Sequence, residues 1–391
     1  MKRNKEGLNK GYKYLLSLGH LFTDMNQGAL PAILPFLILL RNFSYTSAAG
    51  LVLAVNLISS VIQPLFGYWG DKFSRPWLMS LGILLAGTGI ALIGLSNSYQ
   101  TTFAAATISG LGIALFHPEG GKLANFVAGE KKGTGLGIFI VGGNFGFVLG
   151  PIAASVVLVL FGLNGTLLFL IPAGIMSAIY LKFNSEFKEI TVSARKTANL
   201  ETGLKQIDEW NAFIRVALVI SCRSIMQYSL LTFIPLYFIG VFFQSEAAAN
   251  INLIVFSLAG AIATIAGGRI SDSVGFRRTV RVTFFTIAPL MFFLLQTESS
   301  LLAALTVIPI GFAISSSAGA LVAMAQGFVP NHIGLASGIS LGLGISVGGV
   351  CAPLIGLIGD AFGLRPAMYA ILAVAVLAWL LTLILPKAPN S

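Results

Sequence analysis

The stretch GYWGDKFSR, at positions 67–75, recurs in the second half of the chain as GRISDSVGFRR, at positions 268–278. Both copies begin with glycine and place an aspartate four residues later, so that Asp71 corresponds to Asp272. Each copy stands between two long apolar stretches. A charged loop that repeats in this setting indicates two copies of one membrane-embedded unit.

Two further landmarks repeat at nearly the same offset. A glycine-rich run ends at Pro151 in the first half, and another ends at Pro353 in the second half. Gln27, in the first apolar stretch, likewise corresponds to Gln227. Three independent landmarks at nearly one spacing predict a parallel duplication, which is the architecture of a rocker-type transporter with its site near the bilayer midplane.

Composition places most of the chain inside a membrane. Hydrophobic residues make up 56% of the 391 residues and charged residues 10%, and the mean hydropathy is +0.87. Soluble domains carry about 25% charged residues, and one span needs about 20 predominantly apolar ones. We therefore expect twelve transmembrane helices, at 14–40, 46–69, 77–96, 100–127, 133–161, 164–183, 212–240, 246–271, 279–297, 300–328, 333–359 and 364–385.

The predicted fold is all-α, with these helices in two pseudo-symmetric bundles of six. The polar stretch 184–211 is the expected linker, between an N-terminal bundle at 1–183 and a C-terminal bundle at 212–391. Lys and Arg gather on the side that holds the N-terminus, whereas Arg41 and Arg365 fall on the other side. Because basic residues mark cytoplasmic loops, both termini are expected to be cytoplasmic, with no signal peptide removed. The net charge of +10 then reflects topology and not nucleic-acid binding.

The repeated loop also carries a family resemblance. The pattern Gly-x-x-x-Asp-x-x-x-Arg at 67–75 resembles the signature loop of the major facilitator superfamily, and the run ending at Pro151 resembles its antiporter-associated motif. More narrowly, GHLFTDMNQGALPAILPF and LFHPEGGKLA look like the fosmidomycin-resistance branch of bacterial efflux proteins. The resemblance covers essentially the whole chain. It implies a monomeric drug-efflux protein of the inner membrane. No Ser–His–Asp set, nucleotide-binding loop or metal motif is visible in the sequence, so the chain is not expected to be an enzyme.

The resemblance further implies that the signature loop is a conformational latch. From the residues themselves, the aspartate can cap a neighbouring helix N-terminus or pair with an arginine, and the glycines allow close approach of helices. The alternative is an ordinary cytoplasmic turn that holds a solvated acid. The latch residues are then Gly67, Asp71 and Arg75 in the first half, and Gly268, Asp272 and Arg277 in the second.

The glycine-rich run GTGLGIFIVGGNFGFVLGP, at 133–151, spaces small residues for tight helix packing. It is not expected to cradle phosphate, because it lies in an apolar span and follows no strand. The packing residues are Gly142, Gly146, Gly150 and Pro151. The resemblance adds that this helix lines the contact between the halves and helps to seal the outer side. Asn144, flanked by glycines, is expected to face the cavity.

The apolar stretch 17–36 carries His20, Asp24 and Gln27 on one helical face. An ionised residue near the midplane costs at least about 2.5–3.5 kcal/mol, so such residues usually face a cavity and serve function. The alternative is a structural stripe of hydrogen bonds that joins the first helix to a neighbour.

A second polar site, FHPEGGKLA, lies about two thirds along the fourth span. His117 and Glu119 flank Pro118, which bends the helix and frees a carbonyl. Glu119 can exchange a proton with a wet cavity, or it can simply pair with Lys122 three residues on. The predicted proton-coupling residues are Asp24, Glu119, His20 and His117.

Arg223 lies deep in the seventh span and shares a helical face with Gln227. A guanidinium at that depth must bind an anion or pair with a carboxylate, and a permanent salt bridge to Asp24 or Glu119 is the alternative to a substrate role. The predicted substrate-binding residues are Arg223, Gln27, Gln227, Asn144, Tyr228 and Ser316.

These residues together predict a proton-coupled transporter that exports a small polar or anionic, fosmidomycin-like compound in exchange for protons. Its expected partners are that substrate, protons and the lipid bilayer, and no cofactor or resident metal is expected. One alternative uses His20, Asp24, His117 and Glu119 as ligands for a divalent metal or another small solute as cargo. A more distant alternative is a transport-dead membrane sensor.

Overall fold

The computed structural model describes residues 2–43, 45–73, 75–202 and 207–386. Helices make up nearly all of these ranges, and no strand occurs within them, which confirms the predicted all-α class. By length and composition, eight described segments can cross a membrane. They are Trp77–Leu95, Lys132–Lys182, Trp210–Phe242, Ile251–Val274, Phe276–Gln296, Ser300–Phe328, Pro330–Phe362 and Leu364–Leu383.

The helices follow the apolar stretches because a lipid-embedded backbone must satisfy its own hydrogen bonds. In the first half of the chain they are α1 (Lys2–Arg41), α2 (Tyr45–Lys72), α3 (Trp77–Leu95), α4 (Tyr99–Ala128), α5 (Lys132–Phe161), the 3-10 segment η1 (Gly162–Phe169), α6 (Leu170–Lys182) and α7 (Asn184–Thr202). In the second half they are α8 (Trp210–Phe242), α9 (Glu246–Val274), α10 (Phe276–Gln296), α11 (Ser300–Ser316), α12 (Ala318–Phe328), η2 (Pro330–His332), α13 (Ile333–Gly338), the π-helical η3 (Ile339–Leu343), α14 (Gly344–Phe362) and α15 (Leu364–Leu383).

Serines mark the starts of several helices. The Ser98 hydroxyl accepts a hydrogen bond from the Thr101 amide at the start of α4, and Ser245 and Ser299 cap α9 and α11 in the same way. A side-chain oxygen at this position satisfies one of the amides that a helix leaves without a partner. Gly363, with φ at 94°, turns the chain into α15, a backbone conformation that glycine adopts without strain.

The described chain divides into two compact units. The first runs to Gly129 and also contains Ile138–Ile207 and Pro330–Gly342. The second contains Glu130–Gly137 and Asp208–Val329, and it resumes at Leu343. The chain passes from the first unit to the second at Ile207–Asp208, inside the segment 184–211 that the sequence proposes as linker. Of that segment, residues 203–206 lie outside the described ranges. Each unit thus includes one short segment from the other half of the sequence.

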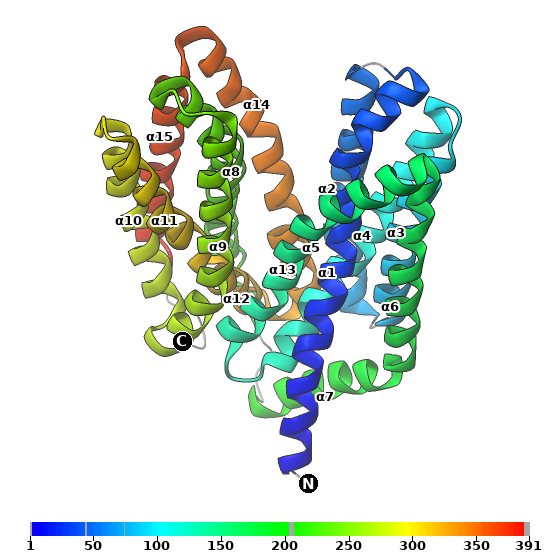
Figure 1. The fold of residues 1–391 in the computed structure, drawn as a ribbon. Coiled ribbons are helices and arrows are strands. Elements are labelled where there is room, and N and C mark those ends of the chain that lie inside the picture. The colour runs from blue at the N-terminus through cyan, green and yellow to red at the C-terminus, as the bar shows by residue number, and fades with distance from the viewer. Residues whose placement is uncertain (1, 44, 74, 203–206, 387–391) are drawn as a thin grey trace. The chain divides into compact units, whose positions relative to one another are not determined.

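The first unit is built around α4. Helix α3 packs along α4, α1 and α2 lie against it as well, and α6 covers α3 (Figure 1). Glycines allow the α3–α4 approach: a Cβ at Gly89 would lie 2.6 Å from the carbonyl oxygen of Ala105. Leu30, Ile90 and Ile113 are among the buried apolar side chains between these helices. The polar residues of α1 and α4 are therefore held inside a closely packed bundle.

The linker segment contains helix α7, whose inward face belongs to the first unit. Phe187 is 0% exposed, and Thr191, one turn later, is buried on the same side. The Phe187 ring lies 5.6 Å from that of Tyr12 and 5.5 Å from that of Tyr180. A segment that reads as polar thus docks on the bundle through a few apolar side chains.

The second unit packs α9 on α11, and α14 and α15 on α8. The stretch predicted as one span at 300–328 divides at Ser317 into α11 and α12. The hydroxyls of Ser316 and Ser317 donate back to the carbonyls of Ala313 and Ile314, and serines that bond to their own backbone in this way weaken a helix interior. The stretch predicted at 333–359 likewise divides at the π-turn Ile339–Leu343.

Gly146→Ala and Gly174→Ala form a matched test of close packing in the first unit. A Cβ at Gly146 would lie 2.8 Å from the Met25 amide nitrogen and 3.0 Å from the Asp24 Cβ, whereas nothing lies within 4 Å of a Cβ at Gly174. Alanine favours a helix over glycine by up to about 1 kcal/mol at both sites. We expect Gly146→Ala to lower the thermal unfolding midpoint of the detergent-solubilised protein and Gly174→Ala to maintain or raise it. Equal midpoints would show that α5 does not depend on this contact.

Candidate functional site

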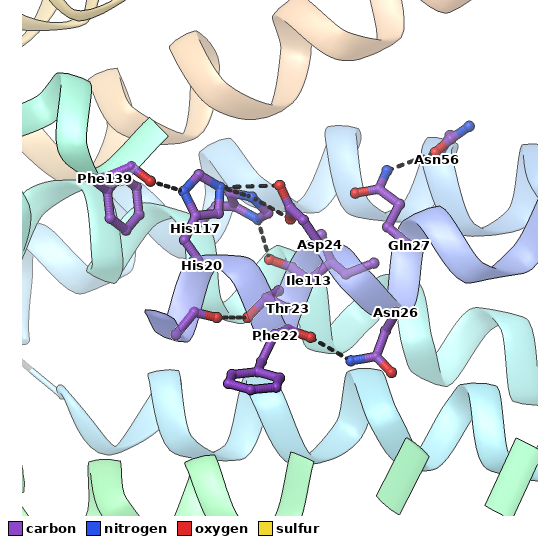
Figure 2. A network of polar contacts seen from close by, with 11 residues as sticks. His20, Phe22, Thr23, Asp24, Asn26, Gln27, Asn56, Ile113, His117 and Phe139 are labelled. Atoms are coloured by element: carbon purple, nitrogen blue, oxygen red, sulfur yellow. Dashed lines mark hydrogen bonds and ion pairs between the residues drawn. The ribbon is translucent and has the colours of Figure 1, made fainter. Parts of the chain in front are cut away.

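His20, Asp24 and His117 converge inside the first unit. The two α1 residues are one turn apart, and His117 reaches them from α4 (Figure 2). The Nε2 atoms of the histidines are 3.0 Å apart. The Asp24 carboxylate lies 3.2 Å from His20 Nε2 through Oδ2 and 3.1 Å from His117 Nε2 through Oδ1. All three side chains are at most 5% exposed, and we call them the His–Asp–His triad.

Backbone carbonyls fix the tautomer of both histidines. His20 Nδ1 is 2.7 Å from the Phe139 oxygen, and His117 Nδ1 is 2.9 Å from the Ile113 oxygen. A carbonyl oxygen only accepts hydrogen bonds, which assigns a proton to each Nδ1. The neutral imidazoles then turn bare Nε2 lone pairs toward each other and toward the carboxylate of Asp24. Three facing acceptors require a shared proton or a cation between them.

Gly143 of helix α5 packs directly against the triad. A Cβ at Gly143 would lie 2.6 Å from both Asp24 Oδ2 and His20 Nε2, so a side chain there would displace the polar atoms. Sequence reasoning did not single out Gly143. The sequence signal was the pair of adjacent glycines. Gly142 packs against α1, and Gly143 faces the Asp24 carboxylate.

The predicted packing glycines of α5 lie against α1. Cβ atoms at Gly142, Gly146 and Gly150 would meet the carbonyl oxygens of Ser17, Leu21 and Met25, respectively. Their spacing of four residues matches successive turns of the two helices. Pro151 follows, half-buried, whereas Asn144 is exposed.

Gln27 extends the polar face of α1 by one more turn. Its Nε2 donates to Oδ1 of Asn56 on α2 at 2.9 Å (Figure 2). Gln27 is buried and Asn56 is half-buried. Asn56 was not predicted, although an amide within the apolar stretch 46–69 was a visible signal.

Glu119 has a different partner from the triad. Its Oε1 lies 2.8 Å from Lys122 Nζ, and that ammonium also donates to the Gly70 carbonyl at 2.8 Å. All of these groups are buried. The pairing that the sequence offered as the alternative for Glu119 is therefore present. Through the hydrogen bond of Lys122 to Gly70, this pair is also attached to the backbone of the signature loop.

Among the described residues, the cluster that could ligate a metal is the triad alone, with ligand atoms within 4.8 Å of one another.

Asp71 caps the start of α13. Its Oδ1 accepts from the Gly334 amide at 2.7 Å and its Oδ2 from the Leu335 amide at 3.0 Å. Gly67 lets the backbones meet, because a Cβ there would lie 2.7 Å from the Leu335 nitrogen. Burial raises the pKa of the Asp71 carboxyl above its ordinary value, and the two amides and the Lys122 charge act against that rise.

Asp272 makes the equivalent cap in the second unit. Its Oδ1 accepts from the Gly133 amide at 2.7 Å, and its Oδ2 accepts from the amide and the hydroxyl of Thr134 at 2.8 Å and 2.6 Å. A Cβ at Gly268 would meet the Gly133 carbonyl. Of the predicted latch arginines, Arg75 is exposed beside the Phe73 ring, and Arg277 is half-buried.

The remaining predicted binding residues lie in the second unit. Arg223 is half-buried, and its Nε donates to the Ile314 carbonyl at 2.9 Å. Gln227 is half-buried on the next turn of α8. Tyr228 lines a cavity of about 650 Å³ between α8 and α14, together with residues such as Phe233. The Ser316 hydroxyl is bonded to its own helix.

Comparisons with known proteins match nearly the whole chain to one family. The sequence model of the Major Facilitator Superfamily matches residues 16–340 and, in a second match, 216–391. The chain is 30% identical over 374 residues to the fosmidomycin resistance protein of Escherichia coli (strain K12), covering 95% of this chain and 91% of that protein. It is 31% identical over 386 residues to the uncharacterized MFS-type transporter YfnC of Bacillus subtilis (strain 168), covering 96% and 93%.

Solved structures agree on the fold. The proton:xylose symporter XylE, bound to 6-bromo-6-deoxy-D-glucose, superposes with a TM-score of 0.75 at 15% identity, covering 97% of this chain and 96% of that one. The human organic anion transporter MFSD10 gives a TM-score of 0.76 at 15% identity, covering 96% and 99%. At this identity the likeness concerns the fold alone.

Asp71→Asn tests the cap in the signature loop. Asparagine has one acceptor oxygen and no charge, so one of the two amides loses its partner, and we expect a loss of about 1 kcal/mol in stability. Asp272→Asn should behave similarly, because its carboxylate also binds two amides. The control is Glu298→Gln, which removes an exposed acid in a loop. Thermal unfolding of the purified protein measures all three, and a change no larger than that of the control would contradict the capping role.

Proposed function

The chain belongs to the major facilitator superfamily, and on that premise we propose that it exports a small polar or anionic drug-like compound in exchange for protons. It is a multi-pass membrane transporter and not an enzyme. The proposal adds twelve spans, cytoplasmic termini, a place in the bacterial inner membrane and action as a monomer by alternating access. The carrying observation is the His–Asp–His triad.

The triad supports proton coupling through its charge balance. With one proton at either Nε2, the cluster contains an imidazolium, a carboxylate and a neutral imidazole, so its net charge is zero. Without that proton, the two Nε2 lone pairs face each other and a buried carboxylate, which is costly in an apolar bundle. The proton therefore leaves only when water or a substrate donor replaces it. That exchange links proton release to the state of the cavity.

We assign separate roles to the predicted coupling residues. Asp24 carries the charge that binds the proton, and His20 and His117 hold or relay it, with their Nδ1 atoms fixed by backbone carbonyls. The ion pair of Glu119 with Lys122 favours a supporting role at Gly70 over direct proton transfer. This division separates two acids that the sequence treats alike.

The substrate assignment rests on the second unit and on the relatives. In the proposal, Arg223 holds an anionic group, and Gln27, Gln227, Asn144, Tyr228 and Ser316 complete the polar contacts as the two units alternate. A half-buried guanidinium among apolar helices is a fitting partner for a phosphonate. The Escherichia coli relative is named for resistance to fosmidomycin, and we propose a compound of that kind as substrate.

The metal grouping favours a second candidate, transport of a divalent cation. Two imidazole nitrogens and a carboxylate within 4.8 Å of one another form a ligand set suited to zinc or a similar ion. Glu119, which the sequence included in this set, is engaged with Lys122. In this candidate the cation itself replaces the proton at the triad.

Asp24→Asn and Glu119→Gln are expected to have different effects on transport driven by an imposed pH gradient. Asp24→Asn should abolish proton-driven transport of fosmidomycin into inside-out liposomes, because the neutral amide cannot balance an imidazolium. Glu119→Gln should retain coupling at a reduced rate, since its loss affects the loop. Substrate accumulation and internal pH are measured together.

Retention of coupling in Asp24→Asn would overturn the assignment of the proton site. The same liposomes, loaded with a zinc-sensitive dye and given Zn²⁺, test the second candidate. Zinc flux that is lost in Asp24→Asn, without fosmidomycin transport in the parent protein, would favour the cation as cargo.

Arg223→Lys separates charge from geometry at the proposed anion site. Lysine keeps the positive charge but loses the planar, bidentate fork and the Nε bond to Ile314. We expect an increase in the apparent KM for fosmidomycin with a smaller change in maximal rate, because the loss concerns ground-state binding. Unchanged kinetics in Arg223→Lys and in Arg223→Gln would remove the arginine from the substrate site.

A further inference from the structure

Aromatic rings fill the first unit between the triad and helix α7. Phe139 stacks on His20 at 4.2 Å, and Phe116 lies 6.1 Å from His20 and 6.3 Å from Phe139, measured between ring centroids. Tyr180 continues the series 6.1 Å from Phe116, and Phe187 follows 5.5 Å from Tyr180. We call Phe139, Phe116, Tyr180, Phe187 and the last ring, Tyr12, the aromatic column.

The column is tightly closed. Phe116 and Phe187 are 0% exposed, and Phe139 and Tyr180 are 1% exposed. Its rings come from five different helices, namely α1, α4, α5, α6 and α7. Protein interiors packed in this way leave few voids that hold a water molecule, and the three phenylalanine rings of the column offer such a water no partners.

Tyr180 is fixed in the column by the backbone of α1. Its hydroxyl donates to the Leu15 carbonyl at 3.0 Å. The ring occupies the place where a side chain at position 19 would stand, because a Cβ at Gly19 would collide with the Tyr180 hydroxyl. The glycine that precedes His20 is therefore required by the column, and its packing also sets the backbone that carries the triad.

The two sides of the triad differ in polarity. Toward α7, the buried face of α1 carries Leu16 and Tyr12 at four-residue intervals from His20. Away from α7, the same helix continues from Asp24 to Gln27, which is bonded to half-buried Asn56. One side of the triad is dry and aromatic, and the other carries the groups that water or a polar solute would bind.

We propose that the aromatic column is a dry barrier that closes the interior of the first unit, so that protons reach the triad only from the Gln27 side. The proton part rests on the proposed function. A proton then has no separate route through the bundle, and it enters and leaves through the space that the substrate also uses. The column thus enforces the exchange of substrate for protons, because it blocks a separate proton route through the first unit.

The linker helix takes part in this barrier. Phe187, at the start of α7, is the ring that joins Tyr180 to Tyr12. Displacement of α7 from the first unit would remove one ring and open the column from its outer end.

Thiol labelling at position 16 tests the barrier without reference to any transported ion. Leu16 is 0% exposed and lies one turn from both Tyr12 and His20. In a protein with Cys222 and Cys351 replaced by alanine, Leu16→Cys should react with a water-soluble maleimide far more slowly than Asn97→Cys, which places the thiol in an exposed loop. Labelling of Leu16→Cys as fast as Asn97→Cys would overturn the barrier.

A second part of the labelling experiment removes a ring from the column. Adding Phe187→Ala to Leu16→Cys should raise the labelling rate severalfold, and Phe187→Leu, which keeps apolar volume, should raise it less. Phe103→Ala is the matched control, because Phe103 is 40% exposed on α4. If Phe187→Ala misfolds, Tyr180→Phe, which removes only the hydroxyl bond, replaces it. No increase in a folded variant would contradict the role of the column.

Proton flux completes the test. In liposomes without substrate, Phe116→Ala should increase proton leak severalfold over the parent protein, whereas Phe103→Ala should not. A leak-free Phe116→Ala that retains coupled transport would overturn the proposal. The labelling result holds whichever ion drives transport, so a failure of proton coupling in the parent protein is distinguished from a failure of the barrier.

Discussion

A carboxylate inside an apolar bundle must be neutralised where it lies, and the position of Asp24 imposes that requirement on the rest of the first unit. The neutralising groups are two imidazoles whose other nitrogens are held by backbone carbonyls, so the triad cannot relax by turning a ring. The helices must then approach closely enough to bring α1, α4 and α5 to one point. Glycines on α5 allow that helix to lie close to α1. Among them, Gly143 leaves room for the side-chain atoms of Asp24 and His20.

The same constraint explains why the buried acids of this chain have different consequences. Glu119 and Lys122 neutralise each other within one helix, and the ammonium still serves the Gly70 carbonyl. Such a pair is complete without any other species. The triad is not complete, because its three facing groups are all acceptors. A site whose neutral side chains present acceptors alone can bind and release a proton. An ion pair that already satisfies both partners is suited to a structural role.

Much of the fold was readable in the sequence, because the bilayer allows few choices to an apolar backbone. The stripe of His20, Asp24 and Gln27 was visible for a similar reason, as one helix sets its own spacing. The meeting of His117 with Asp24 was not visible, since spacing along a chain does not report contacts between helices. For the same reason the partner of Asp71 and the inward face of α7 could not be inferred. The break at Ser317 depends on hydroxyls that bond to their own backbone, a local choice that hydropathy does not register.

The two aspartate caps differ in one respect that their symmetry conceals. Asp272 binds amides at Gly133 and Thr134, which precede it in the chain, whereas Asp71 binds amides at Gly334 and Leu335, which follow it by most of the protein. During synthesis from the N-terminus, the first of these contacts can form as soon as α9 is complete. The Asp71 contact cannot form until α13 has been made, after α8 to α12 of the second half. Biogenesis therefore closes the two equivalent loops in a fixed order, with the Asp272 contact first and the Asp71 contact second.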